Sequence, residues 1–182
     1  MAASIEHYQL PLPQDLGAVR LLIVVAPYYR QIADDLIAGA RATAKAAGAS
    51  ADLVEVPGAL EIPSAIAMAA ARGLYDGYVA LGCVIRGETT HYDTVCNDSS
   101  RGLTLLGLQG TCIGNGILTV ENTQQAVVRA DPQGQNKGGG AAAAALHLIA
   151  LKRGWESRPA GEARTPRDVI RLAGEIDGPA GA

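Results

Sequence analysis

The 182-residue sequence contains no phenylalanine, one tryptophan and three cysteines. Because Cys83, Cys96 and Cys112 form an odd, widely spaced set without a C-x-x-C pair, they indicate reduced thiols and argue against a disulfide framework. No block of lysine or arginine stands out and the formal net charge is −3, which argues against a nucleic-acid binder. The sequence therefore predicts a cytoplasmic protein that binds no nucleic acid.

Long hydrophobic runs are also missing. The longest, residues 138–151, is rich in alanine and too short for a membrane span, which needs about 20 apolar residues. The first 16 residues lack the basic and apolar regions of a signal peptide. With 48% hydrophobic and 18% charged residues, the chain is expected to form one globular domain without a membrane partner.

What the sequence does contain is an alternation of strand-like and helix-like patterns. Short apolar, β-branched runs predict strands at 19–26, 51–56, 77–85 and 111–120, the last interrupted by Gly114 and Gly116. Helical spacing predicts a first helix that ends near Gly48, a second that begins at Pro63 and a third that spans 90–110. A fourth helix begins at the cap Asn122, and a fifth spans 139–155. Four strand–helix alternations predict an α/β fold, with helices on both faces of a parallel sheet.

The two ends of the chain differ from this pattern. Residues 1–18 are polar and punctuated by proline, so we expect an N-terminal arm before a domain at 19–156. Residues 157–182 form a C-terminal extension, in which Thr165 and Pro166 can start one short helix before a frayed tail.

Ligands bind outside the carboxyl ends of parallel strands, which directs attention to residues 27–30, 57–61, 86–91 and 115–120. Gly87 to Thr90 follow a strand and precede a helix, where unpaired amides and the helix dipole favour an anion. The alternative is a simple cap, because Thr90 and Asp93 have the spacing of a capping box. His91, beside this turn, is either a proton-transfer residue or a partly buried, hydrogen-bonded histidine.

Other polar and aromatic residues near these loops have two interpretations each. Glu61 either binds sugar hydroxyls or interacts with a helix dipole. Arg129 and Lys137 are either solvated surface charges or phosphate ligands. Tyr28 and Tyr29 end the first strand, where one ring can stack on a flat heterocycle or both can pack in a core or interface.

The motifs PGALEIP, ALGCVIRGETTHYDTV, NGILTVENTQQAVVRA and NKG occur in this order and at these separations. In this arrangement the chain resembles the 6,7-dimethyl-8-ribityllumazine synthase family over about residues 21–155. The resemblance implies a flavodoxin-like three-layer sandwich with a four-stranded parallel sheet. It also implies condensation of 5-amino-6-ribitylamino-uracil with 3,4-dihydroxy-2-butanone 4-phosphate, without cofactor or metal, in the penultimate step of riboflavin biosynthesis. Homopentamers, single or assembled further, would hold the active sites between subunits.

The resemblance also implies roles for individual residues. Tyr28 would stack on the pyrimidine, His91 would move protons, and Arg129 from the neighbouring subunit would pair with phosphate. The remaining implied substrate-binding residues are Ala59, Leu60, Glu61, Val84, Ile85, Gly87, Glu88, Thr89, Asn115 and Lys137.

Three features depart from the family pattern. Gly140 stands where members usually carry an acidic residue oriented toward the histidine, and Asn115 and Leu60 stand where many have phenylalanine. The segment 131–137 lacks a turn associated with shell-forming members, which favours a pentamer or decamer. The alternatives are a catalytically weakened paralogue, which binds a flavin-like ligand or acts as an oligomeric scaffold, and a flavodoxin-like electron carrier.

Overall fold

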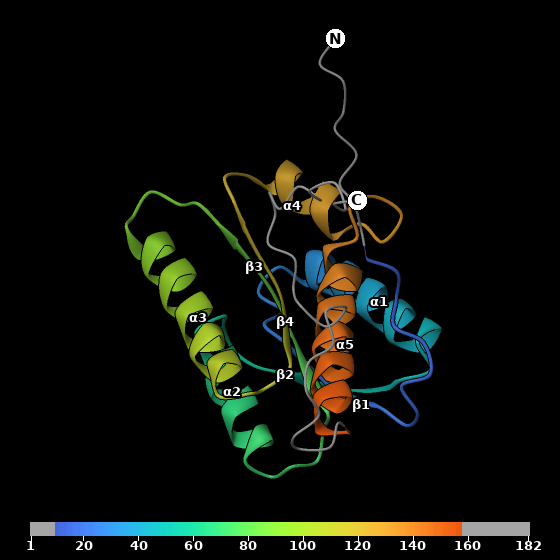
Figure 1. Ribbon diagram of the computed structural model, residues 1–182. Coiled ribbons are helices and arrows are strands. Elements are labelled where there is room, and N and C mark those ends of the chain that lie inside the picture. Colours follow the sequence, from blue (N-terminus) through green and yellow to red (C-terminus); the bar gives the residue numbers. More distant parts are fainter. Residues whose placement is uncertain (1–9, 158–182) are drawn as a thin grey trace, which may run out of the picture.

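The computed structural model describes residues 10–157, which form a four-stranded parallel sheet between two layers of helices (Figure 1). The strands lie in the order β2-β1-β3-β4 and comprise β1 (Arg20–Val25), β2 (Ser50–Glu55), β3 (Gly77–Ile85) and β4 (Ile113–Val120). The helices are α1 (Arg30–Ala46), α2 (Glu61–Ala70), α3 (His91–Leu108), α4 (Thr123–Ala130) and α5 (Lys137–Glu156). The predicted α/β architecture is confirmed.

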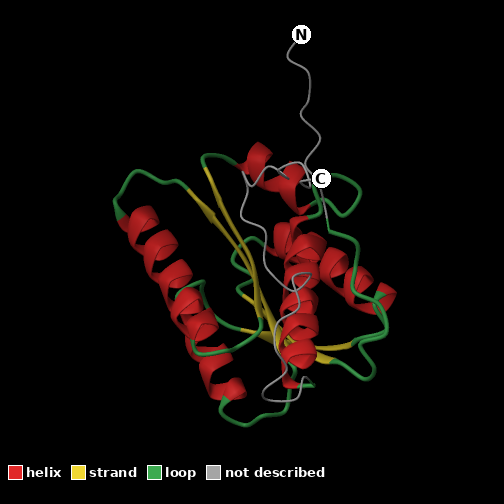
Figure 2. Ribbon diagram, in the orientation of Figure 1, coloured by secondary structure: helices red, strands yellow, loops and turns green. Residues whose placement is uncertain are grey.

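Helices cover both faces of the sheet (Figure 2), and one hydrophobic cluster on each face holds the layers together. Alternate residues of β1, such as Ile23 and Val24, point into opposite clusters and are fully buried. One cluster joins the sheet to α1, α4 and α5, and the other joins it to α2 and α3. Since β1 is covered on both faces, its apolar sequence has no polar alternation.

Two details of the sequence prediction are wrong. β4 continues through Gly114 and Gly116 without interruption. A Cβ at Gly114 would overlap the carbonyl group of Ala141, so this glycine allows α5 to approach the strand. α2 begins at Glu61, and Pro63 is its third residue, still within the first turn where proline is tolerated.

The part of the N-terminal arm that is described, residues 10–18, packs against the domain. Leu12 and Leu16 contact the cluster beneath α1 and α5, and Arg153 of α5 donates hydrogen bonds to the carbonyls of Leu16 and Ala18. The helix expected at Thr165 lies outside the described residues, so the proposed domain boundaries stay predictions. Every helix within residues 10–157 is too short or too polar to cross a membrane.

Candidate active site

A pocket of about 450 Å³ lies at the carboxyl ends of β1 and β3. The connections from these two adjacent strands cross to opposite faces of the sheet, which is where parallel α/β folds place their ligands. The pocket brings together nine of the predicted site residues, namely Tyr28, Ala59, Leu60, Glu61, Val84, Ile85, Gly87, Thr89 and His91. These residues come from the ends of three strands, so the fold assembles them from distant parts of the chain.

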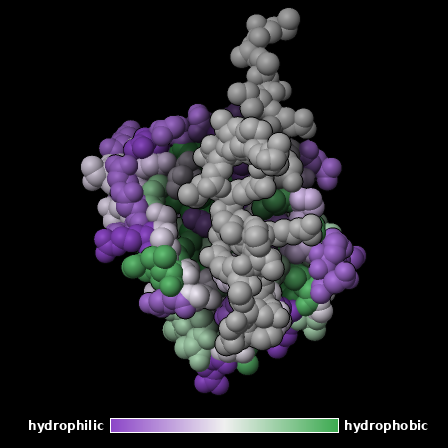
Figure 3. All heavy atoms as spheres, in the orientation of Figure 1, coloured by the Kyte–Doolittle hydropathy of each residue, from purple (hydrophilic) through white to green (hydrophobic). Residues whose placement is uncertain are grey.

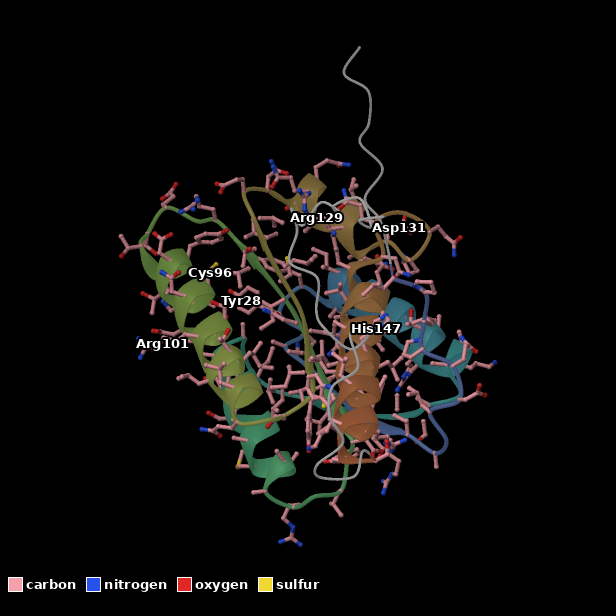
Figure 4. The ribbon with its side chains drawn as sticks, viewed as in Figure 1. Tyr28, Cys96, Arg101, Arg129, Asp131 and His147 are labelled. Carbon is pink, nitrogen blue, oxygen red and sulfur yellow. The ribbon has the colours of Figure 1, made fainter. Side chains whose placement is uncertain are left out.

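The other predicted site residues lie outside this pocket. Glu88 is on the same turn and is exposed, whereas Asn115 of β4 lines a separate groove beside α3 and α5. Lys137, the first residue of α5, borders a third cavity. Arg129 is on α4, near the top of Figure 4, and its Nη1 donates to the carbonyl of Gln125 at 3.1 Å. A single chain therefore does not gather all thirteen residues.

The turn between β3 and α3 has unpaired donors. Within residues 10–157, the backbone amides of residues 87–90 donate to no acceptor. The alternative interpretation, a capping box at Thr90, is wrong, because this residue already has helical backbone angles of −67° and −4° and its side chain caps no amide. The hydroxyl of Thr89 accepts a hydrogen bond from the His91 amide at 3.4 Å instead. Four free amides at the positive end of an 18-residue helix form a suitable anion cradle.

Aromatic rings form one wall of the pocket. The rings of Tyr28 and Tyr29 meet edge to face, with centroids 5.1 Å apart and planes at 72°. Tyr29 packs against the core, and burial raises the pKa of its phenol, whereas Tyr28 is 76% exposed. The half-buried Tyr29 ring thus supports an exposed Tyr28 ring, which is accessible to a planar ligand.

The remaining polar groups of the pocket limit its chemistry. Burial raises the pKa of the Cys83 thiol to about 11, so this cysteine is not a poised nucleophile. Glu61 is the first residue of α2 and also lines the pocket, so its carboxylate can interact with the positive end of the helix dipole and with a ligand. The described residues contain no cluster of side chains suited to hold a metal ion.

No lysine or arginine is among the residues that line the pocket in the described part of the chain. The nearby Arg30 already pairs with Glu55 at 2.7 Å, and Arg86 pairs with Glu121 at 2.8 Å. An anion bound here would therefore meet backbone amides from this chain and would need a cation from elsewhere.

Several lining residues were not predicted. Tyr92 and Val95 follow His91 on α3, and Val95 lies four residues on, which places both near the histidine on the helix. Helical spacing from His91 would have identified Val95. Pro57 and Gly58 lie in the loop 57–61 that the sequence indicated for ligand binding, although neither was given a role. Cys83 lines the pocket because β3 ends there beside β1.

Comparison with known proteins gives a consistent result. The sequence profile of the 6,7-dimethyl-8-ribityllumazine synthase family matches residues 18–153. A protein of that name from Jannaschia sp. (strain CCS1) is 52% identical over 164 residues, covering 90% of this chain and 92% of the relative. Proteins of the same name from Novosphingobium aromaticivorans and Zymomonas mobilis are 55% and 56% identical, over 75% and 74% of this chain and 98% and 96% of their own lengths. This chain belongs to the 6,7-dimethyl-8-ribityllumazine synthase family.

Proposed function

We propose that this chain is an active lumazine synthase, which condenses 5-amino-6-ribitylamino-uracil with 3,4-dihydroxy-2-butanone 4-phosphate in riboflavin biosynthesis. The observation that carries the proposal is the cradle of amides at residues 87–90 that have no acceptor in the described chain, of which Gly87 and Thr89 line the same pocket as His91 and the exposed ring of Tyr28. One substrate has a phosphate and the other a flat ring, and this pocket offers a group suited to each. A cytoplasmic location and independence of cofactors are parts of the same proposal.

Each pocket residue has a role in this reaction. The amides of residues 87–90 and the Thr89 hydroxyl hold the phosphate, and Tyr28 stacks on the pyrimidine ring. Glu61 accepts hydrogen bonds from the ribityl hydroxyls, whose chain lies along Ala59 and Leu60. Val84 and Ile85 flank the ring at the end of β3.

His91 moves protons between the reacting groups. The amine of the pyrimidine attacks the ketone, and the resulting carbinolamine loses water to give an imine. Phosphate then leaves, and the ring closes with loss of a second water. Each of these steps transfers a proton, and general acid–base help is typically worth about 10²–10⁴-fold. Orientation of two substrates in one pocket supplies a further large part of the acceleration.

The site is completed by a second copy of the chain, in a homopentamer or an assembly of pentamers. Among residues 10–157 no lysine or arginine lines the pocket, while Arg129, Lys137 and Asn115 lie elsewhere on the chain. Beside β4, an apolar groove of about 550 Å³ is lined by residues of α3 and α5 that include Leu108, 80% exposed, and Trp155, 64% exposed. Figure 3 shows hydrophobic surface over the lower half of α3. Exposed apolar surface of this kind favours burial against another subunit.

A weakened paralogue is the second candidate. Gly140 has no side chain to orient His91 of an adjacent subunit, and a Cβ built there would meet no atom within 4 Å. The lack of an acidic side chain at residue 140 favours a protein that binds the pyrimidine or acts as a scaffold with little turnover.

Product formation tests both candidates. Purified protein is mixed with the two substrates, and the absorbance and fluorescence of the lumazine product are followed. We expect turnover well above the uncatalysed rate and a native mass that is a multiple of five subunits. Pyrimidine binding without turnover would favour the scaffold, and a yellow, redox-active protein would indicate the electron carrier instead.

A further inference from the structure

Arg86 joins three elements at the rim of the pocket without lining it. Its Nε donates to the Glu121 carboxylate at 2.8 Å, just beyond β4, and its Nη1 lies 3.4 Å from the Asp93 carboxylate on α3. Its Cζ is also 4.0 Å from the centre of the Tyr92 ring. The guanidinium is therefore held by two carboxylates and one aromatic face.

These contacts fix the start of α3. Tyr92 and Asp93 follow His91 directly in the first helical turn, and Arg86 directly precedes the turn at residues 87–90. The backbone amide of Arg86 donates to the Val120 carbonyl at 2.9 Å, which anchors one end of the turn to β4. The amide cradle and His91 therefore lie in the chain between Arg86 and two residues that its side chain contacts, Tyr92 and Asp93.

A second set of contacts leads from Glu121 to α4. The amide of Glu121 donates to the side-chain oxygen of Gln125 at 3.0 Å, and Arg129 donates to the carbonyl of Gln125 at 3.1 Å. The Asn122 side chain accepts from the Gln125 amide at 2.9 Å and caps the same helix. Arg86 is therefore connected through Glu121 and Gln125 to Arg129.

We propose that Arg86 is a positioning residue that acts on two active sites at once. Through Tyr92 and Asp93 it sets the anion cradle and His91 of its own pocket. Through Glu121 it sets the helix that presents Arg129 to the pocket of the neighbouring subunit. This inference rests on the proposed function, which places Arg129 in that neighbouring pocket.

The geometry explains why arginine is needed. A planar guanidinium can contact two carboxylates through separate nitrogens while one face covers an aromatic ring, whereas a lysine ammonium is a point charge that cannot do all three. The Arg86 side chain is 42% exposed, so its ion pairs add little to stability. Its main effect is expected on the placement of groups that bind phosphate.

The test uses the assembled protein and steady-state kinetics with both substrates varied. The variants are Arg86→Lys, Glu121→Gln and the double variant. Arg101→Lys is a matched control, because this exposed arginine of α3 points outward (Figure 4) and makes no ion pair or side-chain hydrogen bond with residues 10–157. Native mass and thermal unfolding verify that each variant is folded and assembled.

We expect Arg86→Lys to raise KM for the phosphate-bearing substrate by about three- to tenfold and to leave KM for the pyrimidine unchanged. Glu121→Gln should act in the same direction. Because the two residues form one contact, the double variant should match the larger single effect and not their product. The Arg101→Lys control should behave like the unaltered protein.

Three results would overturn the inference: no change in either KM for Arg86→Lys, equal changes in both, or multiplicative effects in the double variant. Arg129→Ala separates this failure from that of the proposed function. If Arg129→Ala weakens only the phosphate substrate while Arg86→Lys does not, the positioning role is wrong and the proposed function stands. If Arg129→Ala is not selective, its proposed phosphate role and the α4 branch of this inference are both wrong.

Discussion

The two ends of the sheet differ in how completely the chain satisfies its own polar groups. At the amino end, Asp52 accepts from Tyr75 at 2.9 Å and lies 3.4 Å from Arg20. Asp76 there accepts from the Arg20 amide at 2.8 Å and from Arg153 at 2.7 Å. At the carboxyl end, the amides of residues 87–90 have no acceptor within the described chain. The carboxylates of Asp52 and Asp76 at the amino end are therefore paired, whereas the carboxyl end has amides available for a ligand.

This contrast separates stability from function. Paired groups at the amino end tie together β1, α5 and the loop before β3, so changing them should affect unfolding. Free groups at the carboxyl end contribute little to folding, because they make few contacts until something binds. Substitutions at the amino end should therefore change stability without changing kinetics, and substitutions at the carboxyl end should change kinetics without changing stability.

The largest expected effect is on catalysis and comes from His91→Asn. We expect kcat to fall by about 10²-fold through loss of proton transfer, with no change in thermal unfolding, since His91 is exposed. His147→Asn on α5 tests a histidine outside the pocket, and its kcat should be unchanged, although its half-buried ring makes it a control for kcat only. Product absorbance and a melting curve measure the two quantities. A large loss of stability in His91→Asn would contradict the claim that substitutions at the carboxyl end leave unfolding unchanged.

Arg129→Ala should have the next largest effect. A charged hydrogen bond contributes about 1.5–3 kcal/mol, so KM for the phosphate substrate should rise by about 10- to 100-fold while the pyrimidine is bound normally. Arg101→Ala serves as the control for loss of an arginine elsewhere on the surface. Initial rates with each substrate varied in turn give the comparison, and equal losses for both substrates would contradict the phosphate role.

Much of the fold followed from the sequence because its signals are local. Apolar strands, helical spacing and the Asn122 cap, whose side chain does accept from the Gln125 amide, are set by residues close together in the chain. Strand order is not local, and no order was predicted from the sequence. The continuity of β4 through Gly114 was missed because the reason is an approach by α5.

The candidate site divides in the same way. Tyr28, Glu61 and His91 were predicted because each follows a strand at the edge where ligands bind, and the structure brings all three to one pocket. Arg86 was not predicted, since its contacts depend on Glu121, which is 35 residues away. Asn115, Arg129 and Lys137 lie outside this pocket, and their place in the site belongs to the proposal that a second subunit completes it.

At the amino end, Asp76→Asn should reduce stability without altering kinetics. Removing the charge weakens the hydrogen bonds from the Arg20 amide and Arg153, at a cost of about 1–2 kcal/mol after allowance for the partial exposure of the side chain. Urea unfolding and kcat are the two measurements. A change in kcat would show that the two ends of the sheet are not independent.

The pH dependence of unfolding sharpens the same test. Burial alone would raise the pKa of Asp76, but hydrogen bonds from the Arg20 amide and Arg153 outweigh it and lower the pKa below 3.8. Because the pKa of Asp76 is lower in the folded than in the unfolded chain, its ionised carboxylate stabilises the fold at pH values above the unfolded pKa. This stabilisation is lost as the pH falls through the folded pKa. The difference in free energy of unfolding between the unaltered protein and Asp76→Asn should therefore shrink as the pH drops below about 4.

The smallest expected effect comes from adding a carboxylate at Gly140, where the chain has none. Gly140 lies in the first turn of α5, and a Cβ added there would meet no atom of the described chain within 4 Å. In Gly140→Glu, a carboxylate oriented toward His91 of the neighbouring subunit would favour the imidazolium and raise kcat by about threefold. Gly140→Ala is the matched control, because it gains about 1 kcal/mol of helix stability without adding a carboxylate. If both variants have the same kcat, the glycine is not what limits proton transfer, and the site works with His91 unassisted.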